Sequence, residues 1–395
     1  MSTHILRSPF VRCCAALCGV VALAAASSAL AAPPRPQRSP SAFVPGTGAC
    51  IDFAGDDFED ATWEFVHRHP KSSREQDERV RSPMGVSTND RWHEGPERGQ
   101  PDQIETVATP PLGLPGSERA LLLRTLNSGI PGYNSSDVQQ DDLIANCLER
   151  LRGDIPVGER PSCTVRVYLP PVEQWEKRSG PQFGYRASLS TVTTTRKKVG
   201  LFSMGTTTEV EPYWPGMWIH FRARGTKAAK AGTAYIAVRG DRLGRDFGAL
   251  EINEFGWWTL GMSFSAHGMV HYYASPGIDE LTAADHLTSQ HPYSYTARDF
   301  RTYFFDVCNQ NNGRTWSTPF VVDDPKLYVI NSQRVESIVK RQEQAAIQQA
   351  ERQRKAVEQQ AVRQKQLDER RAAQREAAAN RTATRPQQRQ QRSSR

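Results

Sequence analysis

The sequence lacks the signatures of several common protein classes. Beyond its first 32 residues, the chain of 395 residues has no run of about 18 or more apolar residues, so no further membrane-spanning helix is expected. It has no Gly-rich phosphate loop, no Gly-x-Ser-x-Gly elbow and no His-Glu-x-x-His helix, so nothing points directly to nucleotide, serine-hydrolase or zinc-protease chemistry. Internal repeats are absent, and helical patterns are scarce before residue 331.

Residues 1–32 have the pattern of a secretory signal peptide. Arg7 and Arg12 form a basic start, an apolar run follows from Cys13 to Ala26, and small residues at 27–32 offer cleavage positions. The apolar run is shorter than a membrane-spanning helix requires. We therefore expect an exported protein, secreted or periplasmic, with no transmembrane segment after cleavage. The alternative is a retained N-terminal anchor.

Cysteine is sparse, and three of the seven cysteines lie within the signal peptide. The remaining four are an even number, which in an exported protein is typical of two disulfides. Of the three connectivities we favour Cys147–Cys163, which closes a local loop, and Cys50–Cys308, which ties the first strand to a late one. Buried free thiols are the alternative, and the spacings do not resemble a zinc site.

The C-terminal region carries the positive charge of the chain. From Arg334 to Arg395 there are 16 basic and 7 acidic residues, whereas the whole chain has a net charge of only +7. Residues 331–379 are rich in Gln, Arg and Ala, which predicts a helical or weak coiled-coil segment, and residues 380–395 have the composition of a disordered basic tail.

This basic region is expected to contact an anionic polymer or surface, and a solvated tail without a partner is the alternative. It lacks interleaved aromatic residues, so no specific nucleic-acid binding is expected.

The body of the chain, residues 41–330, reads as one β-sandwich domain. All eight Trp and all eleven Tyr lie between Trp63 and Tyr328. Apolar and polar residues alternate in several short stretches, a pattern typical of antiparallel strands with one solvated face. Helical spacing predicts one helix over Gln139 to Leu151, and residues 64–119 read as a long ordered loop layer or a partly disordered insertion. The predicted strands cover residues 163–169, 183–189, 217–223, 234–239, 258–264, 269–273, 300–307 and 319–322.

Three stretches of the body resemble secreted bacterial jelly-roll proteins of the concanavalin A-like lectin/glucanase type. Asp56 to Asp60 with Trp63 looks like an opening strand of these sandwiches. The segment from Trp257 to Tyr273 is similar to the strand–turn–strand hairpin of laminin-G-like modules, and Phe320 to Pro325 resembles their closing strand. The resemblance implies an all-β, concanavalin A-like jelly-roll sandwich. The galactose-binding-like jelly roll is the second fold considered.

Acidic residues gather in the opening and closing stretches that carry this resemblance. In related jelly rolls the first and last strands lie close together, and a structural calcium often joins them. Ca²⁺ takes roughly six to eight oxygen ligands. The resemblance therefore implies a structural Ca²⁺ as a candidate cofactor, and the alternative is solvated carboxylates at strand ends. The candidate ligands are Asp56, Asp57, Glu59 and Asp323.

Glu251-Ile252-Asn253-Glu254 is the one enzyme-like motif. Laminarinase-type glycoside hydrolases of this fold carry a Glu, Asp, Glu series on one strand, and a retaining mechanism needs two carboxyls about 5 Å apart. Here Asn253 takes the middle position, and strict alternation puts Glu254 on the opposite face from Glu251. For a lyase, His271 and Tyr273 on one strand face are the corresponding weak candidates for the base.

A polar and aromatic strand face is the main candidate binding site. Aromatic rings stack on sugars, and arginine pairs with carboxylates or sulfates. We therefore predict a carbohydrate-binding, lectin-like protein that acts at the cell envelope or on extracellular glycans, acidic glycans included. The alternatives are a polysaccharide lyase or glycoside hydrolase that uses the same face, and a structural envelope protein with a basic tether. The predicted binding residues are Trp218, His220, Arg222, Tyr235 and Arg239.

Overall fold

The computed structural model describes residues 42–198, 204–223 and 232–392. The predicted signal peptide lies outside these residues. Within them, nearly all regular structure before residue 333 is β-strand, arranged in two sheets, A and B. The short helices between the strands are η1 (Asp52–Ala54), α1 (Arg74–Asp77), α2 (Cys147–Leu151), η2 (Val157–Glu159), η3 (Val172–Gln174), η4 (Ala283–Asp285) and η5 (Pro292–Ser294).

Sheet A contains eight described strands, which pair antiparallel throughout. They are β1 (Ala49–Cys50), β5 (Gln103–Ala108), β6 (Arg119–Arg124), β9 (Ser162–Leu169), β15 (Gly256–Phe264), β16 (Val270–Pro276), β17 (His286–Gln290) and β19 (Phe320–Val329). Their order is β17-β16-β15-β9-β19-β6-β5, and β1 pairs with β19. An early strand of the chain therefore pairs with the last one.

Sheet B contains eleven described strands, again paired antiparallel. They are β2 (Phe65–Val66), β3 (Val86–Ser87), β4 (Trp92–Glu94), β7 (Gln139–Ala145), β8 (Ile155–Pro156), β10 (Gly180–Lys198), β11 (Met204–Tyr213), β12 (Gly216–Arg222), β13 (Thr233–Arg239), β14 (Asp246–Ile252) and β18 (Asp299–Asn309). Their order is β14-β13-β12-β10-β18-β7-β4-β3-β2, and β11 and β8 pair with β10 and β18.

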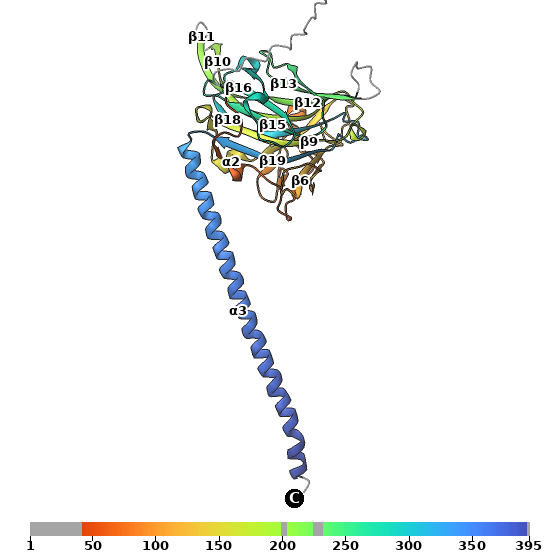
Figure 1. Ribbon diagram of the computed structural model, residues 1–395, viewed down its shortest axis with the longest axis vertical. Coiled ribbons are helices and arrows are strands. Elements are labelled where there is room, and N and C mark those ends of the chain that lie inside the picture. The colour runs from red at the N-terminus through yellow and green to blue at the C-terminus, as the bar shows by residue number, and fades with distance from the viewer. Residues whose placement is uncertain (1–41, 199–203, 224–231, 393–395) are drawn as a thin grey trace, which may run out of the picture. The chain divides into compact units, whose positions relative to one another are not determined.

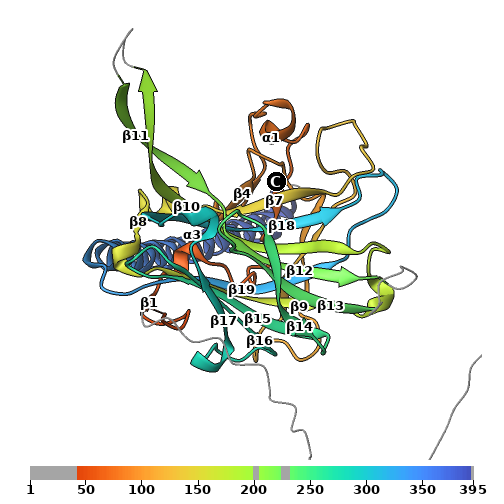
Figure 2. The same cartoon turned by 90° about the horizontal axis from the view of Figure 1, so that it is seen from above.

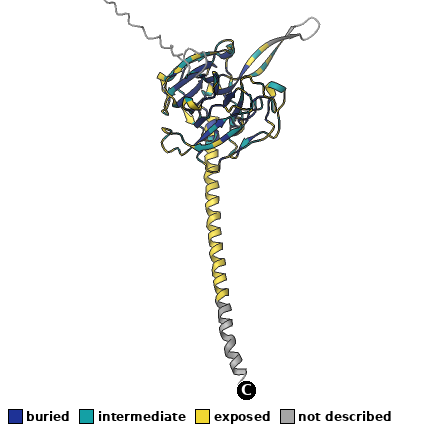
Figure 3. Ribbon diagram, turned by 90° about the vertical axis from the view of Figure 1, so that its right-hand side faces the viewer, coloured by how far each residue is buried: buried dark blue, intermediate teal, exposed yellow. Residues whose placement is uncertain are grey.

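The two sheets form a β-sandwich around one apolar core, which confirms the predicted fold class (Figures 1 and 2). The core cluster takes residues from both sheets, such as Val165 and Leu260 of sheet A and Phe183 and Phe305 of sheet B. Figure 3 shows these buried residues in dark blue within the strand-rich body. Alternation along each strand sends every second side chain into this core.

All eight predicted strands are confirmed, but the predicted helix over Gln139 to Leu151 is wrong. Residues 139–145 form strand β7, and only Cys147–Leu151 forms a helix, α2. Leu143 enters the core from the strand, whereas Cys147 and Leu151 enter it from the helix. The apolar residues of β7 and α2 together fall at helical spacing, so the sequence alone predicts a single helix.

The last described element is α3 (Gln333–Arg392), a helix of 60 residues. Its first turns join the sandwich: Val335 is fully buried, and the Arg334 guanidinium donates to the carbonyl oxygens of Leu151 and Asp154. Residues 340–375 are exposed (Figure 3). The helix continues to Arg392, across most of the 380–395 stretch whose composition suggests disorder. No helix among the described residues is long and apolar enough to cross a membrane.

The four cysteines of the body are free thiols, so neither predicted disulfide is present. Cys50 lies on β1 of sheet A, whereas Cys308 lies in a separate cluster with Trp218, outside the main core. Cys147 and Cys163 both lie in the core, where burial raises their thiol pKa to about 11 and about 12. These thiols are therefore protonated at neutral pH.

Candidate functional site

A groove with a cavity volume of about 650 Å³ lies over the outer face of sheet B, the face turned away from the core. Its floor comes from β7, β18 and β10. Residues of α1 and of the segment 93–98 also line the groove, as do Trp214 and Tyr293. Five arginines line it: Arg74, Arg98, Arg186, Arg239 and Arg301.

The strand register brings the groove side chains together from distant parts of the chain. Arg186 of β10 pairs with Phe304 of β18, Phe304 pairs with Ile144 of β7, and Ile144 pairs with His93 of β4. In antiparallel sheets, directly paired residues point to the same face. One row of side chains therefore crosses four neighbouring strands, and all four of its members line the groove.

Two carboxyls lie side by side next to this row. Asp142 of β7 pairs directly with Asp306 of β18, and these side chains are 5% and 0% exposed. Burial raises the pKa of Asp142 well above its usual range, and the charge and hydrogen bond of Asp306 raise it further, although Arg98 and Arg186 act in the opposite direction. Burial and the nearby carboxyl of Asp306 therefore favour the protonated form of Asp142, which lines the groove.

Arg186 connects the carboxyl pair to the rim of the groove. Its Nη1 lies 3.2 Å from Asp306 Oδ2, and its Nη2 donates to the Trp214 carbonyl oxygen at 2.8 Å. Its Nε is buried and has no hydrogen-bond partner among the described residues. An unpaired buried donor at a cavity is a natural contact point for an oxygen-rich ligand.

The five predicted carbohydrate-binding residues lie together, but only Arg239 lines the groove. Trp218 is 2% exposed, so it offers no platform for a sugar ring. Its neighbours on the flanking strands cover it: the guanidinium carbons of Arg186 and Arg239 lie 5.3 and 5.4 Å from its ring centroid. Gly184 leaves it room, because a Cβ there would lie 2.8 Å from the indole.

The other three members of this group are bound to one another or to a neighbouring strand. The Tyr235 hydroxyl lies 3.1 Å from His220 Nδ1, and Arg222 forms a bidentate ion pair with Glu251 at 2.8 and 2.9 Å. Burial lowers the pKa of His220 to about 4, so its ring is neutral at physiological pH. These residues support the sheet beside the groove.

The structure does not gather the four weak catalytic candidates into one site. Glu251 lies on β14 of sheet B, and Glu254 follows the end of that strand. His271 and Tyr273 lie on β16 of sheet A and are fully buried, and His271 Nδ1 lies 2.7 Å from the Ser289 hydroxyl.

The four carboxylates predicted to bind Ca²⁺ are engaged in separate sets of hydrogen bonds. Asp56 accepts from the indoles of Trp63 and Trp92, Glu59 accepts from two backbone amides, and Asp323 accepts from Ser117. Asp57 caps its own turn at the Glu59 amide. Within the described ranges, no group of three or more His, Cys, Asp or Glu side chains is arranged to hold a metal ion.

Sequence analysis missed the carboxyl pair and Arg186. Asp306 lies inside the apolar run from Tyr303 to Cys308, and a lone charge in a buried strand is a signal of a functional or paired group. Asp142 gave no such signal, because its segment read as a helix. The pair becomes visible only when β7 and β18 are known to be neighbours.

Comparisons with known proteins identify solved structures of similar fold, but they identify no family for this chain. No family model and no curated protein matches the chain. Among solved structures, the PL7 alginate lyase AlyA1 from Zobellia galactanivorans is 9% identical, with a TM-score of 0.28 over 56% of this chain and 79% of that one. A GH131 β-glucanase catalytic domain from Podospora anserina is 10% identical, with a TM-score of 0.33 over 57% and 78%. The Ca²⁺/mannose-bound VIP36 lumenal domain is 9% identical, with a TM-score of 0.26 over 62% and 85%.

Proposed function

We propose that this chain is an exported glycan-binding protein whose ligand lies in the groove over sheet B. The observation that carries the proposal is the lining of that groove. Arginines share this lining with two partly exposed rings, Trp214, which is 37% exposed, and Tyr293. Rings that stack on sugar faces and guanidinium groups that bind oxygen are the usual components of a glycan site.

The charge of the lining favours an acidic glycan. Against its five arginines the groove has three acidic residues, Glu75, Glu97 and Asp142, and burial together with Asp306 raises the pKa of Asp142. Among the described residues, Arg301 forms a 3.6 Å ion pair with Asp154, and its side chain is 39% exposed. Its guanidinium is accessible to a carboxylate or sulfate. The exposed basic helix α3 adds a second attraction to anionic polymers, as a tether outside the groove.

A polysaccharide-degrading enzyme is the second candidate, and the raised pKa of Asp142 supports it. A carboxyl with a raised pKa is the group that protonates a leaving oxygen in glycan cleavage. Asp142 lines the groove, and the Gln140 amide donates to its Oδ1 at 3.1 Å. In this candidate Asp142 is the general acid, and the arginines hold the substrate.

The test is a binding screen of the full chain against neutral, uronate-bearing and sulfated glycans, with product release followed in parallel. Selective binding of acidic glycans that weakens with added salt, without new products, supports the binding function. New reducing ends support the enzyme, and an accompanying unsaturated-uronate absorbance identifies a lyase. Retention of neutral glycans only, or of none, contradicts the proposed acidic ligand. The Arg301→Gln variant should bind acidic glycans more weakly, whereas Arg245→Gln, another exposed arginine outside the groove lining, should not.

A further inference from the structure

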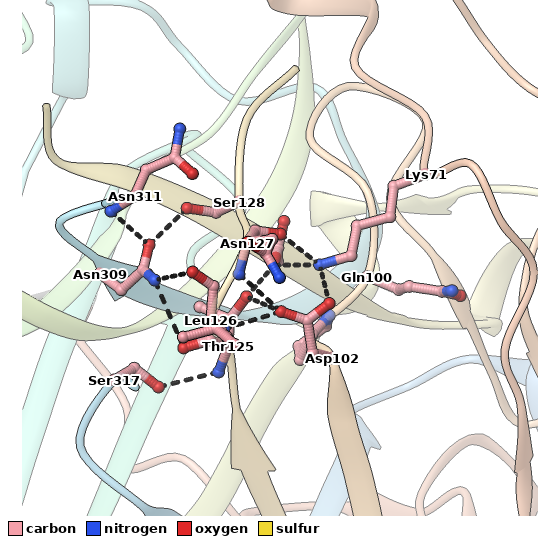
Figure 4. A network of polar contacts seen from close by, with 12 residues as sticks. Lys71, Gln100, Asp102, Thr125, Leu126, Asn127, Ser128, Asn309, Asn311 and Ser317 are labelled. Carbon is pink, nitrogen blue, oxygen red and sulfur yellow. Dashed lines mark hydrogen bonds and ion pairs between the residues drawn. The ribbon is translucent and has the colours of Figure 1, made fainter. Parts of the chain in front are cut away.

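A second ionic cluster, separate from the groove lining, lies where the loop layer meets both sheets (Figure 4). Lys71, from the loop before α1, is 5% exposed. Its Nζ lies 2.8 Å from Asp102 Oδ1 and 2.7 Å from Asp141 Oδ2, and it donates to the Asn127 carbonyl oxygen at 2.7 Å. One largely buried amine thus contacts two carboxyls.

The surroundings of Asp102 distinguish its two oxygens. Oδ2 accepts hydrogen bonds from the backbone amides of Leu126 and Asn127, both at 2.7 Å. Oδ1 faces the Lys71 amine. Two backbone N–H groups on one oxygen are the arrangement that stabilises negative charge when a nucleophile attacks a carboxyl carbon.

Asp141 completes the arrangement. It is fully buried on β7, and burial raises its pKa to about 7 even though Lys71 acts to lower it. Its Oδ2 is shared between the Lys71 amine and the Thr125 hydroxyl. A carboxyl that titrates near neutral pH, in contact with an amine, is suited to carry a proton from that amine.

We propose that Lys71 and Asp102 form an intramolecular amide bond, with Asp141 as the proton carrier. The fold holds Nζ 2.8 Å from Asp102 Oδ1, so the reaction is spared the entropic cost of bringing the two groups together. No cofactor or oxidant is needed, because the reaction is a condensation.

The atoms and protons balance within the cluster. One proton passes from the Lys71 ammonium to Asp102, which leaves a neutral amine beside a neutral acid. Nζ then bonds to Asp102 Cγ, and the negative charge collects on Oδ2, which the two backbone amides hold. A second proton passes from Nζ through Asp141 to Oδ1, the Cγ–Oδ1 bond breaks, and Oδ1 leaves as water. The product has one amide N–H, and Asp141 ends as it began.

The bond would fasten the loop before α1 to the start of β5 in sheet A. Lys71 precedes α1, whereas Asp102 directly precedes β5 of sheet A. The link therefore closes the segment that contains β3, β4 and the α1 side of the groove. A covalent closure lowers the entropy of the unfolded chain, as a disulfide does in proteins with oxidised cysteines. The four free thiols of the body provide no such closure.

Peptide mass spectrometry of the full chain, denatured and digested with trypsin, tests the proposal. The expected product is peptide 69–74 joined to peptide 99–119, lighter than their sum by one water, with Lys71 protected from cleavage. Lys326 is the internal control, because its Nζ also lies 2.8 Å from a carboxylate, that of Asp324, but its side chain is 35% exposed. Cleavage should occur normally after Lys326.

Two variants assign the roles. Lys71→Arg keeps the cation and should give no joined peptide, whereas Asp141→Asn should lower the joined fraction of the protein by at least about tenfold through loss of the proton carrier. Separate peptides 69–71 and 99–119 from the wild-type protein would overturn the proposal. A link from Lys71 to Asp141 in place of Asp102 would overturn the assignment of the electrophile, and full linkage in Asp141→Asn would overturn the role of Asp141.

Discussion

Asp141 and Asp142 are neighbours on β7, yet they belong to two different regions. Asp141 enters the Lys71 cluster, and Asp142 lines the groove. They are 0% and 5% exposed, and burial raises the pKa of both. The neighbours differ: Asp141 meets a lysine, whereas Asp142 meets a second carboxyl, Asp306.

The comparison shows how one strand serves two purposes. Adjacent residues of a strand point to opposite faces. On one face, a buried cation holds the loop layer, β5 and β7 together through short contacts. On the other, Asp142 lines a cavity of about 650 Å³ beside arginines, one of which, Arg186, forms an ion pair with Asp306. The Lys71 cluster stabilises the fold, whereas the groove leaves hydrogen-bond donors available to a ligand.

The largest expected effect concerns the first region. Lys71→Met leaves two buried carboxyls without their cation, so the free energy of unfolding should fall by at least about 3–5 kcal/mol, measured by urea denaturation. Arg245→Met is the control, because the arginine is 73% exposed in its ion pair and its loss should cost less than about 1 kcal/mol. Equal losses in the two variants would show that the Lys71 cluster does not hold the fold together.

The next effect is a pH dependence from Asp141. Its pKa of about 7 in the folded protein lies above the value of about 4 in an unfolded chain. The folded state therefore binds the proton more tightly, and this stabilisation is complete below about pH 4 and is lost as the pH rises to about 7. The stability of the wild-type protein relative to Asp141→Asn should fall across this range. An amide bond between Lys71 and Asp102 would remove the positive charge of Lys71 and raise the pKa of Asp141 further. The pH dependence therefore has the same sign with or without that bond.

The assignment to Asp141 would be contradicted if the stability of the wild-type protein relative to Asp141→Asn stayed constant with pH or grew as the pH rises. Denaturation of both proteins at several pH values in one buffer series provides the measurement. Asp141→Asn is the matched control for every other titrating group, including Asp102. Burial acts to raise the pKa of Asp102, but Lys71 and the backbone hydrogen bonds lower it overall.

The smallest effect is expected in the groove. Burial and Asp306 favour the neutral, protonated form of Asp142, so Asp142→Asn replaces that form with another neutral hydrogen-bonding group. Stability and glycan affinity should each change by less than about 1 kcal/mol, measured by denaturation and by titration calorimetry. If the groove is that of an enzyme, however, turnover should fall by at least about 100-fold, because the amide cannot donate the proton. A large loss of affinity would show that Asp142 binds the ligand as an anion.

The sequence predicts the sandwich better than it predicts the site. Alternation in stretches such as Cys163 to Leu169 depends only on which face is buried, so it is readable locally. The groove depends on which strands are neighbours, and β7 and β18 are far apart in the sequence. Trp218 is an example. The sequence predicts that its side chain points away from the core, but it does not predict that arginines from β10 and β13 bury the ring.

The loop layer shows a second limit. Its composition left an ordered loop layer and a partly disordered insertion both open. The buried partners of Lys71 are Asp102, which directly precedes β5, and Asp141 of β7, and only the fold brings them to the amine.

The most direct test of the glycan groove uses two tryptophans of nearly equal exposure. Trp214 at the groove rim is 37% exposed, and Trp316, outside the groove lining, is 36% exposed. An acidic glycan retained in the screen is titrated into the wild-type, Trp214→Ala and Trp316→Ala proteins. Loss of one stacking ring should weaken binding about tenfold in Trp214→Ala and leave Trp316→Ala unchanged. Unchanged affinity in Trp214→Ala, or an equal loss in both variants, would contradict binding in this groove.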